Sequence, residues 1–224
     1  MQGGIVSAPT GNPTPMPARM PYPTAAPFLP DTLSMRALRD AVQRCEGCPL
    51  FANATQAVFG EGKLRSEVML VGEQPGDQED VAGAPFVGPA GKLLDRALDE
   101  AGIDRGTTYV TNAVKHFKWK ARGTRRIHDK PTWTETLACR PWLEAELALV
   151  KPRALVLMGA TAAQSLLGKT FKVTQNRGTP LDSDLAPLVV ATIHPSAVLR
   201  AENRDEMFAG LVDDLRVVAV GSRE

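Results

Sequence analysis

Short apolar runs alternate with amphipathic segments along this chain. Four runs are mostly apolar over five or six residues, as strands buried on both faces of a sheet are: 67–71, 109–114, 154–158 and 188–193. A loop is predicted from Gly72 to Gly91. Apolar residues then recur at helical spacing to about residue 101, and again over 134–150, 160–167 and 204–218. This alternation predicts a single α/β domain with a central parallel four-stranded sheet between helices.

The first 30 residues differ from the rest of the chain. They hold eight of its 18 prolines and almost no charge. Such a segment buries too little apolar surface to offset its ordering entropy, so we predict a disordered leader over 1–30 and the α/β domain over 31–224. A helix is predicted from Asp31 or Thr32 to just before Cys45. Pro141 predicts a kink or a break in the helix over 134–150.

Composition narrows the class of protein. The chain has 224 residues and is 43% hydrophobic, which suits one domain with its own core. No apolar stretch is long enough for a membrane span and no secretory signal is recognisable, so we expect a cytoplasmic protein. We also expect a monomer. The net charge of +1 means that any nucleic-acid site must come from local clustering of basic residues.

Three loops follow three of the predicted strands: 72–77, 116–128 and 194–200. Because the carboxyl ends of parallel strands share one edge of a sheet, these loops are expected to meet there. A nucleotide-phosphate loop is a poor fit. The segment 88–93 resembles one, but Phe86 stands where its first glycine belongs, and Leu93 stands where Ser or Thr must hold Mg²⁺.

The segment 115–130 is the most basic part of the chain. It contains seven basic residues against one acid, Asp129, and Phe117, Trp119 and Trp133 lie within or beside it. Cations bind phosphates and aromatic rings stack on bases, so this pattern indicates contact with single-stranded DNA or a flipped base. The alternative is a solvated loop.

Several motifs together resemble the uracil-DNA glycosylase superfamily, in particular its iron–sulfur family 4. They are Gly-Glu-Gln-Pro-Gly at 72–76, Pro-Phe-Val-Gly-Pro-Ala-Gly at 85–91, Thr-Asn at 111–112 and His-Pro-Ser at 194–196. The basic stretch 123–128, which ends in His128, is similar to a loop of the UdgX branch, which becomes covalently attached to uracil-containing DNA. In that loop Thr124 occupies a position where UdgX proteins carry lysine.

The resemblance implies a site for uracil-containing DNA, with single strands preferred. Phe86 is expected to stack on the flipped base, and Asn112 to read its edge with an amide that both donates and accepts. Gly72 belongs to the same pocket, and His194 is expected to stabilise charge on uracil O2. The resemblance assigns Gln74 and Asp77 to fixing the loop, the water or the sugar, and phosphate contacts to Arg125, Arg126 and Arg200. Arg200 could instead position the basic loop.

His128 is the candidate nucleophile. Cleavage of the bond between deoxyribose C1′ and uracil N1 leaves an oxocarbenium-like sugar. A neutral imidazole that reaches C1′ would trap this sugar, with Glu73 as its acid partner. Two alternatives remain open: a conventional glycosylase in which water attacks and His128 only contacts DNA, and a non-catalytic single-strand binding protein.

The three cysteines indicate a metal site in a reducing compartment. The resemblance implies a [4Fe–4S] cluster, and His116 stands where the family has its remaining cysteine. The expected ligands are Cys45, Cys48, His116 and Cys139, with a structural role. A zinc ion on three cysteines and one histidine is the alternative.

Overall fold

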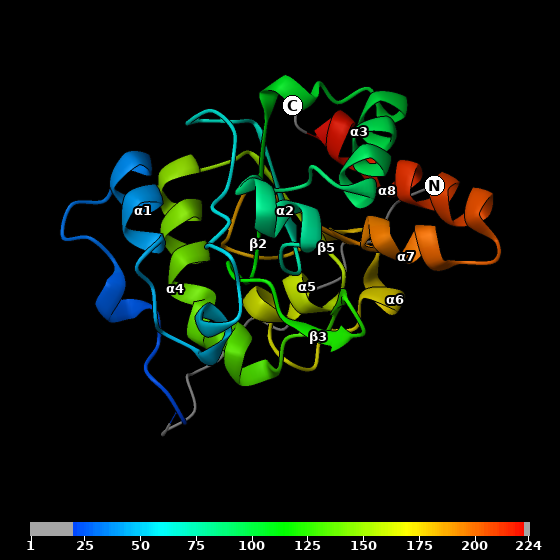
Figure 1. The fold of residues 1–224 in the computed structure, drawn as a ribbon. Coiled ribbons are helices and arrows are strands. Elements are labelled where there is room, and N and C mark those ends of the chain that lie inside the picture. The colour runs from blue at the N-terminus through cyan, green and yellow to red at the C-terminus, as the bar shows by residue number, and fades with distance from the viewer. Residues whose placement is uncertain (1–19, 222–224) are drawn as a thin grey trace.

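A five-stranded sheet forms the centre of the protein in this computed structural model, which describes residues 20–221. The strand order is β2-β1-β5-β7-β6, with β6 antiparallel at one edge and the others parallel (Figure 1). The strands are β1 (Val68–Gly72), β2 (Thr108–Asn112), β5 (Ala154–Met158), β6 (Pro180–Leu181) and β7 (Leu188–Thr192). The predicted α/β fold is confirmed, but the sheet has five strands rather than four. The short strand β6 contains a proline, and a proline is accepted there because β6 lies at the edge.

Helices cover both faces of the sheet. On one face lie α3 (Pro89–Ala101), α7 (Pro195–Arg200) and α8 (Arg204–Gly221). On the other face lie α4 (Trp133–Val150), α5 (Ala160–Leu167) and α6 (Val173–Asn176), with α1 (Met35–Val42) packed outside α4. Figure 1 shows α1 and α4 on one side of the molecule and α3, α7 and α8 on the other. None of the helices within residues 20–221 is long and apolar enough to cross a membrane.

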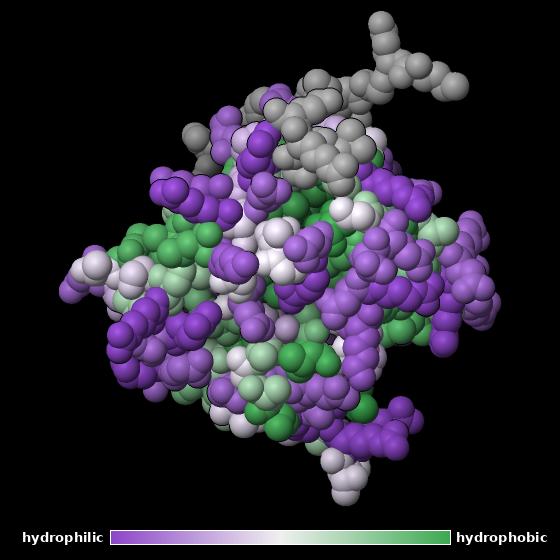
Figure 2. Space-filling model, turned by 90° about the horizontal axis from the view of Figure 1, so that it is seen from above, coloured by the Kyte–Doolittle hydropathy of each residue, from purple (hydrophilic) through white to green (hydrophobic). Residues whose placement is uncertain are grey.

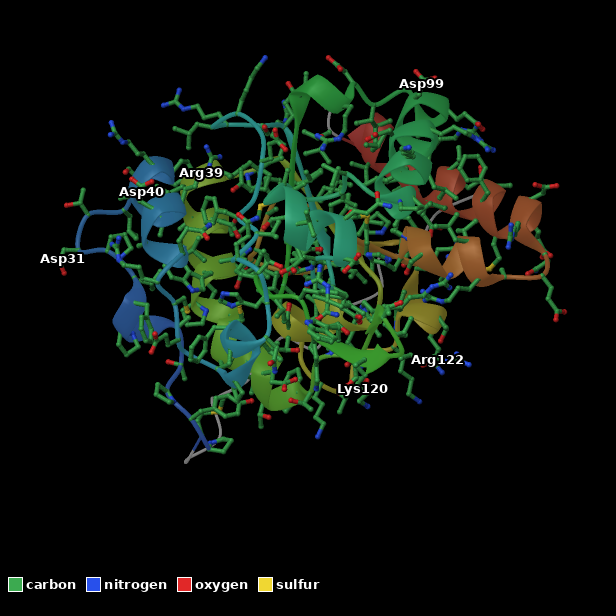
Figure 3. The ribbon with its side chains drawn as sticks, viewed as in Figure 1. Asp31, Arg39, Asp40, Asp99, Lys120 and Arg122 are labelled. Carbon is green, nitrogen blue, oxygen red and sulfur yellow. The ribbon has the colours of Figure 1, made fainter. Side chains whose placement is uncertain are left out.

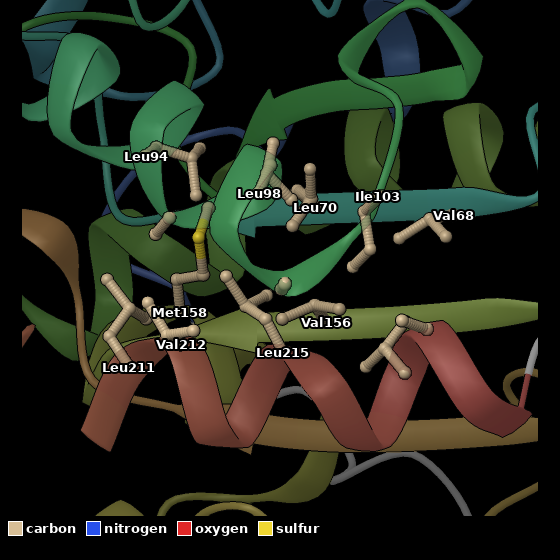
Figure 4. Packing of buried hydrophobic residues seen from close by; sticks show 14 of the residues in the cluster. Val68, Leu70, Leu94, Leu98, Ile103, Val156, Met158, Leu211, Val212 and Leu215 are labelled. Atoms are coloured by element: carbon tan, nitrogen blue, oxygen red, sulfur yellow. The ribbon is translucent and has the colours of Figure 1, made fainter. Parts of the chain in front are cut away.

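Each strand of the parallel sheet supplies apolar side chains to both layers. Leu211, Val212 and Leu215 of α8 pack against β5, and α3 covers the neighbouring strands on the same face of the sheet (Figure 4). Alternate residues of the same strands face the second layer, where they meet α4 and α5. A buried leucine or valine contributes about 1.5–3 kcal/mol to stability, so these two layers hold the strand ends firmly in place. Viewed from above, hydrophilic side chains cover much of the outer surface (Figure 2).

The first described residues are ordered, contrary to the leader predicted over 1–30. Residues 1–19 lie outside the described part of the chain. Residues 20–30 include a short 3₁₀ helix, Ala26–Phe28, and the Ala25 N–H donates to the Ala138 carbonyl oxygen at 2.7 Å. This segment packs on the apolar cluster shared by α1, α4 and the three cysteines. Proline limits its conformational freedom, and the cluster supplies the apolar contacts that its own composition lacks.

Four local predictions need correction, in whole or in part. The first helix begins later than expected, at Met35, because the Ser34 side chain caps it by accepting from the Ala37 N–H. Pro141 lies inside α4 without breaking it. The segment predicted as loop between β1 and Gly91 contains a helix, α2 (Asp77–Ala82), and the basic segment forms a hairpin of β3 (Trp119–Arg122) and β4 (Arg125–His128).

Candidate active site

Gly72 lies at the carboxyl edge of the sheet, in the candidate site that we call the pocket. It ends β1 and pairs in register with Asn112, the last residue of β2. A Cβ atom placed on Gly72 would lie 2.4 Å from Asn112 Oδ1, 2.6 Å from Phe86 Cζ and 3.3 Å from His194 Nε2. Three side chains from three separate segments therefore converge on one point. The glycine is required because any side chain there would fill the space that they surround.

Phe86 is held in an unusual backbone conformation. Its φ of 58° is in the left-handed region, which a bulky residue occupies only when its surroundings enforce it. The turn that follows is tight, since a Cβ on Gly91 would lie 1.7 Å from the Phe86 carbonyl oxygen. The ring is buried, and its centroid lies 6.1 Å from that of His194 at an interplanar angle of 32°. This arrangement fixes one aromatic wall of the pocket.

His194 is placed as a neutral hydrogen-bond donor. It directly precedes α7, and its Nδ1 accepts from the Ser196 N–H at 3.2 Å. Burial lowers the pKa of His194 to about 4; the Glu73 carboxylate opposes this shift, and the charges of Arg200 and His128 add to it. The ring is therefore neutral at pH 7 with its proton on Nε2, the atom that faces the pocket.

Glu73 and His128 are in contact, as the sequence predicts. His128 Nε2 lies 3.2 Å from Glu73 Oε1, and the two side chains are 47% and 21% exposed. Burial alone raises the pKa of Glu73, but hydrogen bonds with His128 and Thr161 outweigh it and hold the pKa below its ordinary value. Glu73 is therefore a carboxylate at neutral pH, next to an imidazole that solvent and DNA can reach.

The hairpin that carries His128 is anchored by Arg126. Its guanidinium contacts Asp77 Oδ1 at 2.6 Å and Asp80 Oδ2 at 2.5 Å, both on α2. Asp80 is fully buried and also accepts from the backbone N–H and the hydroxyl of Thr55. The Arg126 guanidinium is therefore already paired with two carboxylates of the protein, and the phosphate contact expected of Arg126 stays a prediction.

Gln74 anchors the base of the same hairpin. Its side-chain amide donates to the carbonyl oxygens of Lys118 and Asp129, each at 3.1 Å. Its Oε1 accepts from the Lys118 N–H at 3.0 Å. Lys118 lies just before β3 and Asp129 just after β4, next to the Trp119–His128 pair. One side chain thus joins the two strands at the base of the hairpin. This is the loop-fixing role expected of Gln74, and Asp77 shares it through Arg126.

The first three residues of the predicted DNA-binding segment, 115–117, lie inside the protein. Lys115 is fully buried and forms an ion pair with the fully buried Glu146. It also donates to the Asn112 carbonyl oxygen at 2.8 Å, so it supports the pocket from behind. Phe117 is buried as well and is unavailable for base stacking. The chain is still in the core at these residues and reaches the surface only where the hairpin begins, which the basic and aromatic composition of the segment does not reveal.

The hairpin tip keeps part of the expected basic surface. Lys120 and Arg122 of β3 lie at the edge of the molecule (Figure 3). Arg125 is exposed beside them, and Lys120 pairs with Asp129 at 3.1 Å. Arg200 ends α7, where its charge acts on His194. Lys120, Arg122 and Arg125 thus lie on the hairpin that carries His128, and Arg200 lies on the side of His194.

The three cysteines are buried in one apolar cluster. Burial raises the pKa of Cys48 to about 11 and also raises that of Cys139, and their charges act on one another. Trp142 Nε1–H and the Lys115 N–H donate to Cys45 and Cys139 sulfur, each at 3.2 Å. His116 is buried too, but among residues 20–221 no group of three or more His, Cys, Asp or Glu side chains is arranged to hold a metal ion. The thiols suit a soft metal, and the four-ligand set stays a prediction.

Two further residues hold the site together, and the sequence offered no signal for either. Glu79 is buried and accepts from the Gly88 N–H at 2.7 Å and the Gly76 N–H at 3.1 Å, so it links the Phe86 loop to the Glu73 loop. Thr161 of α5 donates to Glu73 Oε2. Glu79 acts locally, three residues after Gly76 and nine before Gly88, whereas Thr161 acts across 88 positions that no local pattern spans.

The fold and the site define a class of protein. It is an α/β domain in which an aromatic ring, an amide and a neutral histidine converge at the sheet edge, beside a carboxylate. A family profile described as the uracil DNA glycosylase superfamily matches residues 59–216. The chain belongs to this superfamily.

The curated relatives refine this assignment. A type-4 uracil-DNA glycosylase of Thermotoga maritima is 38% identical over 172 residues, which cover 76% of this chain and 86% of the relative. A second type-4 enzyme, from Sulfurisphaera tokodaii, is 32% identical over 195 residues, which cover 84% of this chain and 86% of the relative. A type-5 uracil-DNA glycosylase of Pyrobaculum aerophilum is 31% identical over 121 residues, which cover 47% of this chain and 50% of the relative. The chain is thus similar to type-4 proteins over most of its length.

Proposed function

We propose that this protein excises uracil from DNA and becomes covalently attached, through His128, to the sugar that remains. Excision is supported by the superfamily membership and by the type-4 relatives. Attachment is supported by a different observation, the contact between the exposed His128 and the Glu73 carboxylate at the rim of the base pocket.

The pocket has the groups that a flipped uracil needs. The Phe86 ring supplies a stacking surface, and the Asn112 amide supplies both a donor and an acceptor for the base edge. Neutral His194 supplies Nε2–H for the oxygen on which negative charge develops as the base leaves. A neutral donor suits this task because it holds its proton at the pH of the reaction.

The sugar step uses Glu73 and His128. As the C1′–N1 bond breaks, its electron pair leaves with uracil and C1′ gains oxocarbenium character. His128 Nε2 faces Glu73, so the lone pair on Nδ1 forms the new bond to C1′. The positive charge passes to the imidazole ring, where the Glu73 carboxylate stabilises it. No water enters the step, and the product stays bound.

A denaturing gel tests the proposal against its alternatives. The protein is incubated with a labelled uracil-containing oligonucleotide and boiled in detergent, with His128→Ser alongside. We expect a boil-resistant shifted band with the wild type that is absent with the variant. If both release uracil and leave only abasic DNA, water is the nucleophile and His128 contacts DNA. Uncut DNA in both lanes, with a shift only on a native gel, would indicate a binding protein.

We further propose that single-stranded DNA is the preferred partner, that the protein acts as a monomer, and that it works in the cytoplasm. The exposed cations of the hairpin tip support the first, because a flexible strand can follow them into the pocket. The free cysteines support a reducing compartment. Competition between single- and double-stranded oligonucleotides measures the first preference directly.

A structural iron–sulfur cluster is the cofactor that we propose, with Cys45, Cys48, His116 and Cys139 as its ligands. The shared apolar cluster of the three thiols supports the sulfur ligands, and their raised pKa values mean that bound iron must displace their protons. Iron and sulfide analysis of Cys139→Ser and His116→Ala is expected to show loss of both elements. Zinc in the wild type without sulfide would contradict the cluster.

A further inference from the structure

Thr161 contacts the reacting carboxylate from behind. It is the second residue of α5, directly beyond the carboxyl end of β5, and is only 5% exposed. Its hydroxyl donates to Glu73 Oε2, while Glu73 Oε1 faces His128. The two carboxylate oxygens therefore have different partners, one structural and one at the proposed reaction centre.

We infer that Thr161 is a positioning residue that orients the Glu73 carboxylate toward His128. The backbone of Glu73 is already fixed, since its carbonyl oxygen accepts from the Val114 N–H at 3.0 Å. Only side-chain rotation remains free. A hydrogen bond to one carboxylate oxygen removes that freedom and directs the other oxygen outward. This inference rests on the proposed function, because it assigns the purpose of the Glu73–His128 contact.

The direction of the Thr161 hydroxyl supports this role. Thr161 stands in the first turn of α5, where no preceding helical turn offers a carbonyl oxygen to its hydroxyl. It donates to a side chain 88 positions away. Ser165 in the same helix donates to the Ala162 carbonyl oxygen of the preceding turn at 2.7 Å, as hydroxyls inside helices commonly do. Ser165 therefore supplies a matched control for the loss of a buried hydroxyl from α5.

The groups around Glu73 set the expected sign of the effect. Burial raises the pKa of its carboxyl, and the hydrogen bonds of His128 and Thr161, with the charges of His128 and His194, lower it. Valine has the shape of threonine without the hydroxyl donor, so Thr161→Val removes one of the hydrogen bonds that lower the pKa of Glu73. The carboxyl then takes up a proton at a higher pH, and the attack by His128 loses its anionic partner at that pH.

Two measurements on the full chain test the inference. Carbon NMR follows the labelled Glu73 carboxyl in DNA-free protein, with Glu73→Gln to assign the signal. The rate of adduct formation is then followed against pH. With Thr161→Val we expect a higher Glu73 pKa, an acid limb of the rate profile displaced to higher pH, and a tenfold or greater loss of rate at neutral pH. Thr161→Ser and Ser165→Ala are expected to match the wild type.

The outcomes separate this inference from the proposed function. An unchanged Glu73 titration in Thr161→Val, or failure of serine to restore the wild-type titration, overturns the positioning role. A rate that falls equally at every pH, with no displaced limb, overturns it as well. If the wild type forms no adduct while Glu73 titrates as expected, the covalent function fails and the orientation of Glu73 by Thr161 stands.

Discussion

The base pocket and the hairpin are built in different ways. Gly72, Asn112 and His194 stand at or just beyond the ends of buried parallel strands, and helices pack on both faces of the sheet behind them. The hairpin of β3 and β4 lies outside that sheet and carries His128 on an exposed strand. Side chains rather than a core attach it: Arg126 to α2 and Gln74 to both strands. The proposed base recognition therefore lies on the packed sheet, and the proposed covalent step lies on a hairpin that a few side chains attach.

The largest expected effect comes from filling the pocket. Gly72→Ala places a Cβ 2.4 Å from Asn112 Oδ1 and 2.6 Å from Phe86 Cζ. Displacement of these groups by about 1 Å is expected to slow uracil release about 100-fold or more. Single-turnover release from a labelled oligonucleotide measures the effect. Gly106→Ala, at an exposed turn, is the control and should release uracil normally. Wild-type activity in Gly72→Ala would mean that the base binds elsewhere.

Detaching the hairpin should separate the two regions. Arg126→Ala leaves the buried Asp80 without its cation, which is expected to cost about 3 kcal/mol of unfolding free energy. Adduct formation should fall at least tenfold, with uracil release less affected. Urea unfolding and the denaturing gel give the two readouts. Exposed Arg125→Ala should change the unfolding free energy by less than about 0.5 kcal/mol. Equal loss of both activities in Arg126→Ala would show that the pocket depends on the hairpin.

The pocket histidine should make stability depend on pH. His194 has a pKa of about 4 in the folded protein, against about 6.5 when unfolded. Between these values only the unfolded chain binds the proton, so the stabilising contribution is complete above pH 6.5 and is lost as the pH falls toward 4. His194→Asn should therefore lose less stability than the wild type between pH 7 and 4. If the urea midpoint changes with pH by the same amount in the wild type and in His194→Asn, His194 is not the origin of the pH dependence.

The smallest effect is expected at the hairpin tip. Arg125→Ala removes one exposed cation, so DNA binding should weaken a few-fold and the slope of log K against log salt should fall by about 0.7 for a single strand. Fluorescence anisotropy at several salt concentrations measures both. Arg216→Ala, which removes an exposed cation of α8, is the control. A loss of affinity that salt does not alter would indicate a contact other than one to phosphate.

The same contrast explains what the sequence could predict. Gly72 and His194 follow buried apolar runs, so strand periodicity placed them at one edge of the sheet, and the family resemblance added Asn112. The hairpin was missed because its contacts, such as Arg126 with Asp80 and Gln74 with Asp129, join residues 46 and 55 positions apart. Local spacing also made buried Lys115 look like a DNA contact. Only the packing of β2 against α4 reveals that it is part of the core.

Intact-protein mass spectrometry tests the central claim most directly. After incubation with a uracil-containing oligonucleotide, the account predicts a species with the summed mass of protein and DNA less one uracil. Peptide mapping should place the modification on His128. A protein mass that stays unchanged while free uracil accumulates would contradict covalent trapping and leave an ordinary glycosylase.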